Sequence, residues 1–320
     1  MAHYPVDLKS FALKKETTRG TAETAPDKHI KASRDSSFDY SLELVENDRI
    51  QGVVAGEFQP EAGRKIGVGK LTIDLEAATI GEFMYSLLGT VASAQNGTTT
   101  AYTHTFSKTT STQHQAYTLF VNRGVDYFKY NLGVVKRIEF AGDTQGKNTA
   151  AIDLLFKAEA TAASFSPTIA APDPLMFHET SFEIDDVANT NIGKWNFAID
   201  NQSEGLWLLN SSQNLLEIPT AKKLLVEGGF DIYFTNTAQR DDFLANTPRK
   251  LECVMTGGSI TTGQSYALTL AAYGARYTAV SFDTELDGGL LGASVAFKGF
   301  YSVSSAKALD ATLVNTSTTY

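Results

Sequence analysis

The chain has 320 residues, of which 42% are hydrophobic and 20% are charged, with eight prolines and one cysteine. This composition excludes a disordered or proline-rich chain, and the lack of an apolar run of about 18 residues excludes a membrane-spanning helix. A single cysteine excludes an internal disulfide, and a formal net charge of −9 argues against a partner gripped through its phosphates. By length we expect about two domains. The first ten residues show no export signal, so we expect folding in a reducing cytosol.

The first 36 residues are polar and mixed in charge, with no apolar period at helix or strand spacing. We therefore expect an extended arm without a hydrophobic core of its own. From Lys307 onward the chain ends in a comparable polar tail that is rich in serine and threonine.

Between these ends, apolar side chains alternate with polar ones. Four runs show the alternation most clearly, beginning at Phe38, Leu71, Trp195 and Phe230. Each run predicts a strand with one dry face and one solvated face, which is typical of antiparallel sheets. The fold class is therefore predicted to be mainly β.

One segment follows the helical period instead. Apolar residues from Ile80 to Leu88 recur at the spacing of a surface helix. Thr79 and Glu82 have the spacing of a capping box at its start, and Gly89 stands where a C-terminal glycine cap belongs.

A second short helix is predicted between Thr237 and Pro248, with Phe243 and Leu244 facing inward. Like the first helix, it directly follows a strand. This repeated order of strands and helix indicates an internal duplication.

The duplication has a measurable offset. The strand at Phe38 matches the strand at Trp195 (195 − 38 = 157), and the strand at Leu71 matches the strand at Phe230 (230 − 71 = 159). Two later pairs match at an offset near 142, namely Ile138–Phe140 with Val280–Phe282 and Leu155–Lys157 with Ala296–Lys298. The first half is thus longer, and the polar stretch Val91–Gln115 is interpreted as an inserted surface loop.

The predicted organisation is a tandem pair of β-sandwich or β-barrel domains, each with a short flanking α-helix. Its parts are an N-terminal extended arm (1–36), a first β domain (37–165) with a long loop (91–115), a proline-rich linker (166–175), a second β domain (176–305) and a C-terminal Ser/Thr-rich tail (306–320).

Candidate metal-binding groups are few and scattered. The five histidines, which show no metal-ligand spacing, are His3, His29, His104, His114 and His178. An exposed position is expected for His104 and His114, in or beside the polar loop. Asp283–Gly288 resembles the start of a calcium-binding loop, but Ser294 replaces its bidentate glutamate, so a solvated turn is preferred.

Candidate catalytic groups are equally weak. Cys253 lies in an apolar strand, where a buried structural thiol is expected. The carboxylate pairs Asp185–Asp186 and Asp241–Asp242 fall in a turn and a helix and do not indicate a glycosidase. Trp195 shares an apolar face, which predicts core packing, whereas Trp207 could offer a sugar-stacking surface. We predict no enzyme activity, cofactor or metal.

Several segments together resemble the tail tube proteins of long-tailed, siphovirus-like bacteriophages. The resemblance lies in the order and texture of Lys14–Ala22, Gly69–Gly89, Phe197–Asn201 and Val226–Phe234, and it covers most of residues 10 to 305. It implies a β-sandwich with a short helix that assembles into stacked rings around a DNA channel. For a chain with two tandem copies, it implies a trimeric, pseudo-hexameric ring.

The resemblance also implies partners, location and surfaces. We expect a homo-oligomeric tube in the phage tail, assembled in the host cytoplasm, that contacts the tape measure, terminator and tail tip proteins. Double-stranded DNA would pass through the lumen without specific binding, and no membrane is involved. The arm and the tail would act as clasps between rings that become ordered on assembly. The solvated strand positions proposed to line the lumen are Glu43, Asp74, Glu76, Asp200 and Asp231.

Three other interpretations stay open at this level. Another tube-fold element, such as a tail terminator or a secretion-system tube protein, has the same pattern. A two-domain carbohydrate-binding or adhesin module would use Trp207 and the threonine-rich loop. An enzyme would need a pocket that gathers titratable groups, and the sequence indicates none.

Overall fold

The structure of the chain is a computed structural model that describes residues 5–46, 59–168, 173–233, 235–286 and 289–320. It is mainly β, as predicted, and every pairing between its named strands is antiparallel. No helix among these residues is long and apolar enough to cross a membrane.

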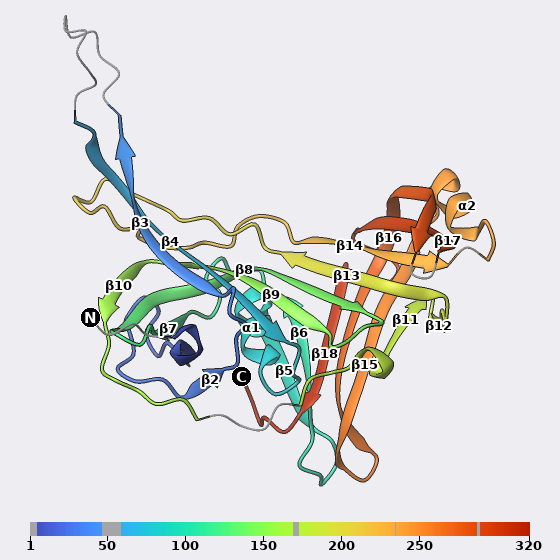
Figure 1. The fold of residues 1–320 in the computed structure, drawn as a ribbon, viewed down its shortest axis with the longest axis horizontal. Helices are drawn as coiled ribbons and strands as arrows, with labels where there is room; N and C mark the ends of the chain where they lie inside the picture. The colour runs from blue at the N-terminus through green and yellow to red at the C-terminus, as the bar shows by residue number, and fades with distance from the viewer. Residues whose placement is uncertain (1–4, 47–58, 169–172, 234, 287–288) are drawn as a thin grey trace, which may run out of the picture.

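A sheet of eight strands, four from each half of the chain, runs the length of the molecule (Figure 1). In spatial order its strands are β3 (Ser37–Val45), β4 (Glu61–Asp74), β9 (Thr149–Phe156), β8 (Tyr127–Asp143), β13 (Ile192–Asp200), β14 (Leu225–Tyr233), β17 (Leu290–Gly299) and β16 (Gln264–Leu286). The order of the first four strands is repeated by the second four, so the duplication is present in the topology.

A second layer repeats in the same way, because the long strands β8 and β16 extend into it. In the first half its order is β2 (Lys28–Ile30), β1 (Ser10–Lys15), β7 (Tyr117–Asn122), β8 and β10 (Ala158–Thr161). In the second half its order is β12 (Val187–Ala188), β11 (Thr180–Ile184), β15 (Arg249–Thr261), β16 and β18 (Leu309–Asn315). Short 3-10 turns, η1 (Val6–Leu8) and η2 (Phe177–Glu179), precede β1 and β11.

The predicted inserted loop is instead largely a β-hairpin, β5 (Gly89–Gln95) and β6 (Tyr102–Lys108). Among the described strands of the second half none corresponds to this hairpin, which is consistent with an insertion in the first half. Its strand β6 pairs with β18, so the insertion connects the first half to the last strand of the second.

The arm and the tail also differ from expectation. β1 is a strand of the second layer with Phe11, Ala12 and Leu13 buried, and β18 lies between β16 and β6. Both segments are therefore ordered within one chain, and they do not fit clasps that fold only on assembly.

Helix α1 (Ile80–Leu88) confirms the first predicted helix and is buried along nearly its whole length. It ends at Gly89, whose φ is 85°, in the left-handed conformation that glycine tolerates. The capping box is wrong, because Thr79 makes no side-chain cap. Glu82 instead accepts a hydrogen bond from the Tyr117 hydroxyl at 2.6 Å.

Helix α2 (Ala238–Ala245) confirms the second helix but not its orientation. Phe243 is 36% exposed and Leu244 is 66% exposed, so neither faces inward.

The pairing registers correct one offset of the duplication. Phe38 lies opposite Gly69, and Phe197 lies opposite Gly228. The offset of β13 from β3 is therefore 197 − 38 = 159, two residues away from the match of Phe38 with Trp195. The long strands keep their predicted offset, because β8 and β16 have bulges after Val135 and Tyr277 (277 − 135 = 142).

Candidate assembly surfaces

The two halves are joined through the main chain of β8 and β13. Phe140 lies opposite Phe197, and Arg137 lies opposite Asp200. The Asn201 N–H donates to the Lys136 carbonyl at 2.9 Å, so the adjacent Arg137–Asp200 pair is a non-hydrogen-bonded one, in which side chains approach most closely. This β8–β13 joint is thus the continuation of one sheet by the next repeat.

The same sheet has two open edges. Within the described residues, β3 pairs only with β4, and the part of β16 from Arg276 to Leu286 pairs only with β17. These edges lie at opposite ends of the molecule, with β3 on the left and β16 beside α2 on the right of Figure 1. Open edges carry unpaired N–H and C=O groups, which another chain can pair with.

One face of the eight-stranded sheet is polar, and four of the five predicted lumen residues lie on it. They are Glu43, Asp74, Asp200 and Asp231; Ile73, Ile199 and Ile232, which adjoin the last three, face the core, and so does Tyr40, three positions before Glu43. Glu76 is different, since it follows β4 and is only 6% exposed. Its carboxylate accepts a hydrogen bond from Lys31 Nζ at 2.8 Å. Glu76 therefore does not belong to the polar face.

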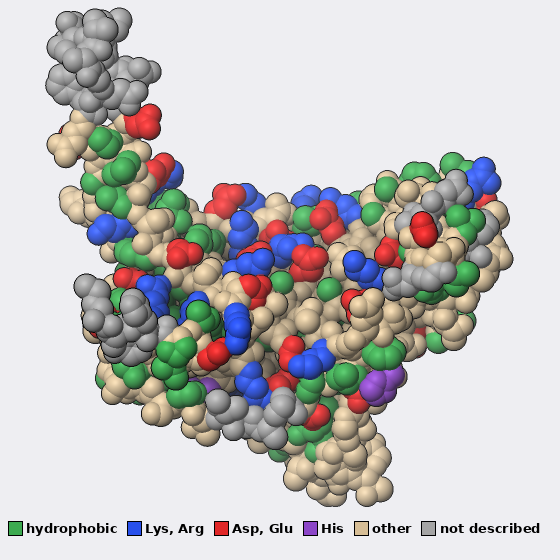
Figure 2. Space-filling model, in the orientation of Figure 1, with side chains coloured by type: hydrophobic (Ala, Val, Ile, Leu, Met, Phe, Trp, Pro, Cys, Tyr) green, Lys and Arg blue, Asp and Glu red, His purple; other side chains and the backbone are tan. Residues whose placement is uncertain are grey.

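Charges of both signs share the polar face. Glu43 pairs with Arg64 and Asp74 with Lys147, at 2.8 and 2.6 Å. The Arg64 guanidinium lowers the pKa of the Glu43 carboxyl below its usual value. Figure 2 shows acidic and basic side chains interspersed across the middle of the molecule. Among described residues, neither Asp200 nor Asp231 has an ion-pair partner.

The polar face is also hollowed near the second half of the sheet. A concavity of about 550 Å³ is lined by Lys194, Asn196, Gly229, Asp231 and Ala279, among others. Small residues at Gly229 and Ala279 leave this space open on the solvated side.

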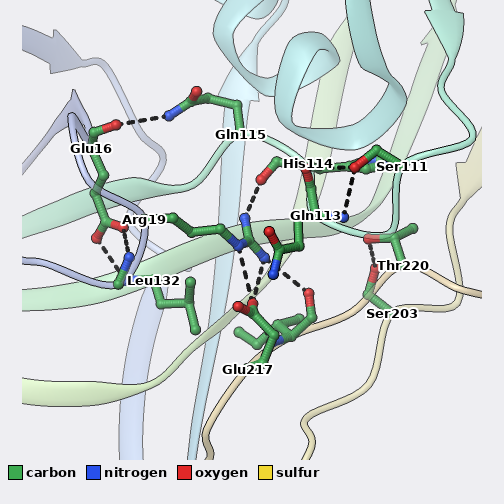
Figure 3. A network of polar contacts seen from close by, with 12 residues as sticks. Glu16, Arg19, Ser111, Gln113, His114, Gln115, Leu132, Ser203, Glu217 and Thr220 are labelled. Atoms are coloured by element: carbon green, nitrogen blue, oxygen red, sulfur yellow. Dashed lines mark hydrogen bonds and ion pairs between the residues drawn. The ribbon is translucent and has the colours of Figure 1, made fainter.

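The joint is reinforced by a polar network around Arg19 (Figure 3). Arg19 Nη2 donates to Glu217 Oε1 at 2.7 Å and to the Ile218 carbonyl at 3.1 Å, and Nη1 donates to the His114 carbonyl. The connection from β13 to β14 is thereby held against the first half, where Leu215 and Ile218 pack on Leu132 and its neighbours.

Two titratable groups lie beside this network, His114 buried and Lys108 half-buried. His114 is 2% exposed, contrary to expectation, and burial, together with the Lys108 charge, lowers its pKa to about 4. Burial also lowers the pKa of Lys108 to about 8. Lys108 Nζ donates to Asn201 Oδ1 at 2.9 Å, and the Asn201 amide donates to the Leu87 carbonyl. This buried cluster links the end of α1 to the end of β13.

The remaining candidates from the sequence are His104, Cys253, His3 and the acidic segment Asp283–Gly288. His104 is fully buried, contrary to expectation, with Nε2 3.1 Å from Asn315 Oδ1. Cys253 is buried as predicted, and burial raises the pKa of its thiol. No cluster of three metal-ligating side chains occurs within the part of the chain that is described. His3 and part of Asp283–Gly288 lie outside that part.

The two tryptophans differ. Trp195 is buried in the core, as predicted. Trp207 packs against the small cluster at the joint, and the Arg64 guanidinium lies 4.8 Å from its ring centroid. The ring therefore has a cation over one face and apolar side chains against it, which is not an open platform for a sugar.

Sequence reasoning missed the joint itself. Arg19 and Glu217 are 198 positions apart, and no local pattern relates them. The sequence held a signal for the position of His104. Asn96-Gly97 is typical of a hairpin turn, which predicts a strand on each side of it, and His104 lies in the second of these strands, β6.

A sandwich with repeated strands and two open edges fits a protein that assembles with copies of itself. A family model described as phage tail tube protein matches residues 8–299. The chain belongs to this family. No curated protein matches the sequence closely enough to count as a relative.

Membership makes this tail tube protein a structural component of the virion tail, in a family that is not enzymatic. Tail tube proteins assemble with themselves and with other tail components. The open edges of β3 and β16 and the polar face are therefore the candidate surfaces for this assembly.

Proposed function

We propose that three chains close into a ring in which β16 of one copy pairs with β3 of the next, and that such rings stack into a tube. The observation that supports this is the β8–β13 joint, which is one such contact already made inside the chain. Repeating the joint with the offsets of 142 and 159 pairs Ala279 with Ser41 of the next copy, as Arg137 pairs with Asp200. A heterologous contact that repeats by rotation closes into a ring.

The polar face of the sheet then lines the lumen through which double-stranded DNA passes. Asp200 and Asp231 supply negative charge there, and the ion pairs at Glu43 and Asp74 prevent their cations from binding phosphate strongly. Such a wall repels DNA weakly and retains none of it. The tape measure, terminator and tail tip proteins are the expected partners at the ends of the tube.

Ring closure is tested by cross-linking a chain that contains both Ser41→Cys and Ala279→Cys. Non-hydrogen-bonded antiparallel pairs have the Cα separation that a disulfide needs. Cys253 is fully buried and does not compete. We expect covalent dimers and trimers on a non-reducing gel, with no larger species. Each single variant alone should give none, because the contact is heterologous. A series extending past the trimer, or no cross-link at all, contradicts the proposed ring.

The lumen is tested by a phage whose tube protein contains Asp200→Lys and Asp231→Lys. Each added cation strengthens salt-sensitive binding of phosphates, so DNA ejection should slow while tubes still form by electron microscopy. Asp126→Lys is the matched control, because Asp126 is exposed in the turn before β8, away from the polar face. Normal ejection by the double variant would mean that this face does not line the channel.

A further inference from the structure

The two equivalent helices differ in what covers their C-terminal ends. In α1, Leu87 is fully buried and its carbonyl accepts a hydrogen bond from Asn201, at the end of β13. In α2, Phe243 and Leu244 are exposed to solvent. The first helix is thus covered at the joint between the two halves, while the second ends beside the open edge of β16.

The internal duplication identifies which residues of the next copy correspond to the cover of α1 and would lie against the end of α2. Both helices end in a left-handed residue, Gly89 and Asn246, which places Leu244 where α1 has Leu87 (246 − 89 = 157). The offset of 159 between β3 and β13 makes Leu42 the counterpart of Asn201, the residue that follows β13 (201 − 159 = 42). Leu42 is 41% exposed, and Leu44 beside it is 58% exposed.

We propose that Phe243 and Leu244 of one copy form an apolar contact with Leu42 and Leu44 of the next copy, outside the sheet that joins them. This lateral apolar contact rests on the proposed ring. It replaces the polar contact of Asn201 with α1, so two exposed apolar groups at opposite ends of the chain cover each other. Exposure of either apolar group to water is unfavourable in free energy, so the hydrophobic effect favours contact between the two groups.

Its chemistry differs from that of the joint inside the chain. The internal joint holds half-buried Lys108 and buried His114 and Asn201 in a polar cluster, whereas the contact between copies is apolar on both sides. An apolar contact needs no aligned hydrogen bonds to form between separately folded chains. Because the edge between copies is apolar and the internal joint is polar, a neighbouring chain would pair less well at the β8–β13 joint than at the open edge.

The contact is tested in the Ser41→Cys/Ala279→Cys chain, whose covalent trimer measures ring closure independently. Adding Leu244→Asp should lower the yield of trimer at least about tenfold, because an unpaired carboxylate would be buried. Leu42→Lys should restore much of the yield in that background by pairing with the new carboxylate. Val125→Asp is the matched control, since Val125 is also 66% exposed but lies in the turn before β8.

Each outcome separates the contact from the ring. The urea midpoint of unassembled Leu244→Asp should equal that of the parent, since Leu244 is exposed in one chain. Trimer yield unchanged by Leu244→Asp overturns the lateral contact and leaves the ring intact. Failure of Leu42→Lys to restore the yield overturns the pairing of these two residues. Absence of trimer in the parent overturns the ring, and the contact with it.

Discussion

Replacing Arg19 with alanine removes the side chain that fastens the β13–β14 connection to the first half. Its guanidinium makes bonds of 2.7 and 3.1 Å to one oxygen of Glu217, and a further bond of 3.1 Å to the Ile218 carbonyl. The two side chains are only 19% and 22% exposed. The cost should lie between an exposed ion pair at under about 1 kcal/mol and a fully buried one at about 3–5 kcal/mol. We therefore expect unfolding to become easier by about 2–3 kcal/mol.

Urea unfolding of the unassembled chain measures this cost. Arg34→Ala is the matched control, because Arg34 also has a carboxylate partner, Asp7, at 2.8 Å but the two are 78% and 65% exposed. That control should change stability by less than about 0.5 kcal/mol. A double-mutant cycle of Arg19→Ala with Glu217→Gln should give a coupling of about 1–2 kcal/mol. If Arg19→Ala costs no more than Arg34→Ala, the network does not fasten the joint.

Two further predictions concern buried groups of the first half. The folded pKa of His114, about 4, lies below the ordinary 6.5, so on acidification the unfolded chain takes up the proton first. Stability should be unaffected by this group above pH 6.5 and should fall between pH 6.5 and 4 by up to about 3 kcal/mol. His114→Gln should flatten that slope in urea melts, and an unchanged slope would assign it to other groups. Gly81→Ala should lower the melting temperature although alanine favours helices, because a Cβ would collide with the Tyr320 ring. In a Tyr320→Ala background the same substitution should raise it, and a fall in both backgrounds would contradict this explanation.

Local patterns were sufficient for the elements with one dry face. The alternating runs at Phe38 and Leu71 lie within β3 and β4, and the helical period from Ile80 corresponds to α1. The period of two could not fix the register of the duplication, because a shift of two residues preserves the face of every side chain. Only the pairing of Phe38 with Gly69 and of Phe197 with Gly228 resolves it.

Segments covered on both sides gave no usable period. Phe11, Ala12 and Leu13 are all buried in succession, so β1 read as an arm without a core. The direction of Phe243 and Leu244 was predicted inward because apolar residues are ordinarily buried within one chain. Four lumen candidates share one face because they lie on strands, whereas Glu76 follows the end of β4 and is buried beside Lys31.

The β8–β13 joint lowers the entropic cost of assembling a tube. In a ring of identical single repeats, every contact would need a separate encounter between molecules, each losing translational and rotational freedom. In the proposed ring, half of the contacts exist before any two chains meet, because the connecting residues hold the two repeats at a high effective concentration. Such a ring would contain only whole pairs of repeats, so the number of repeats around its channel would be even by covalent construction.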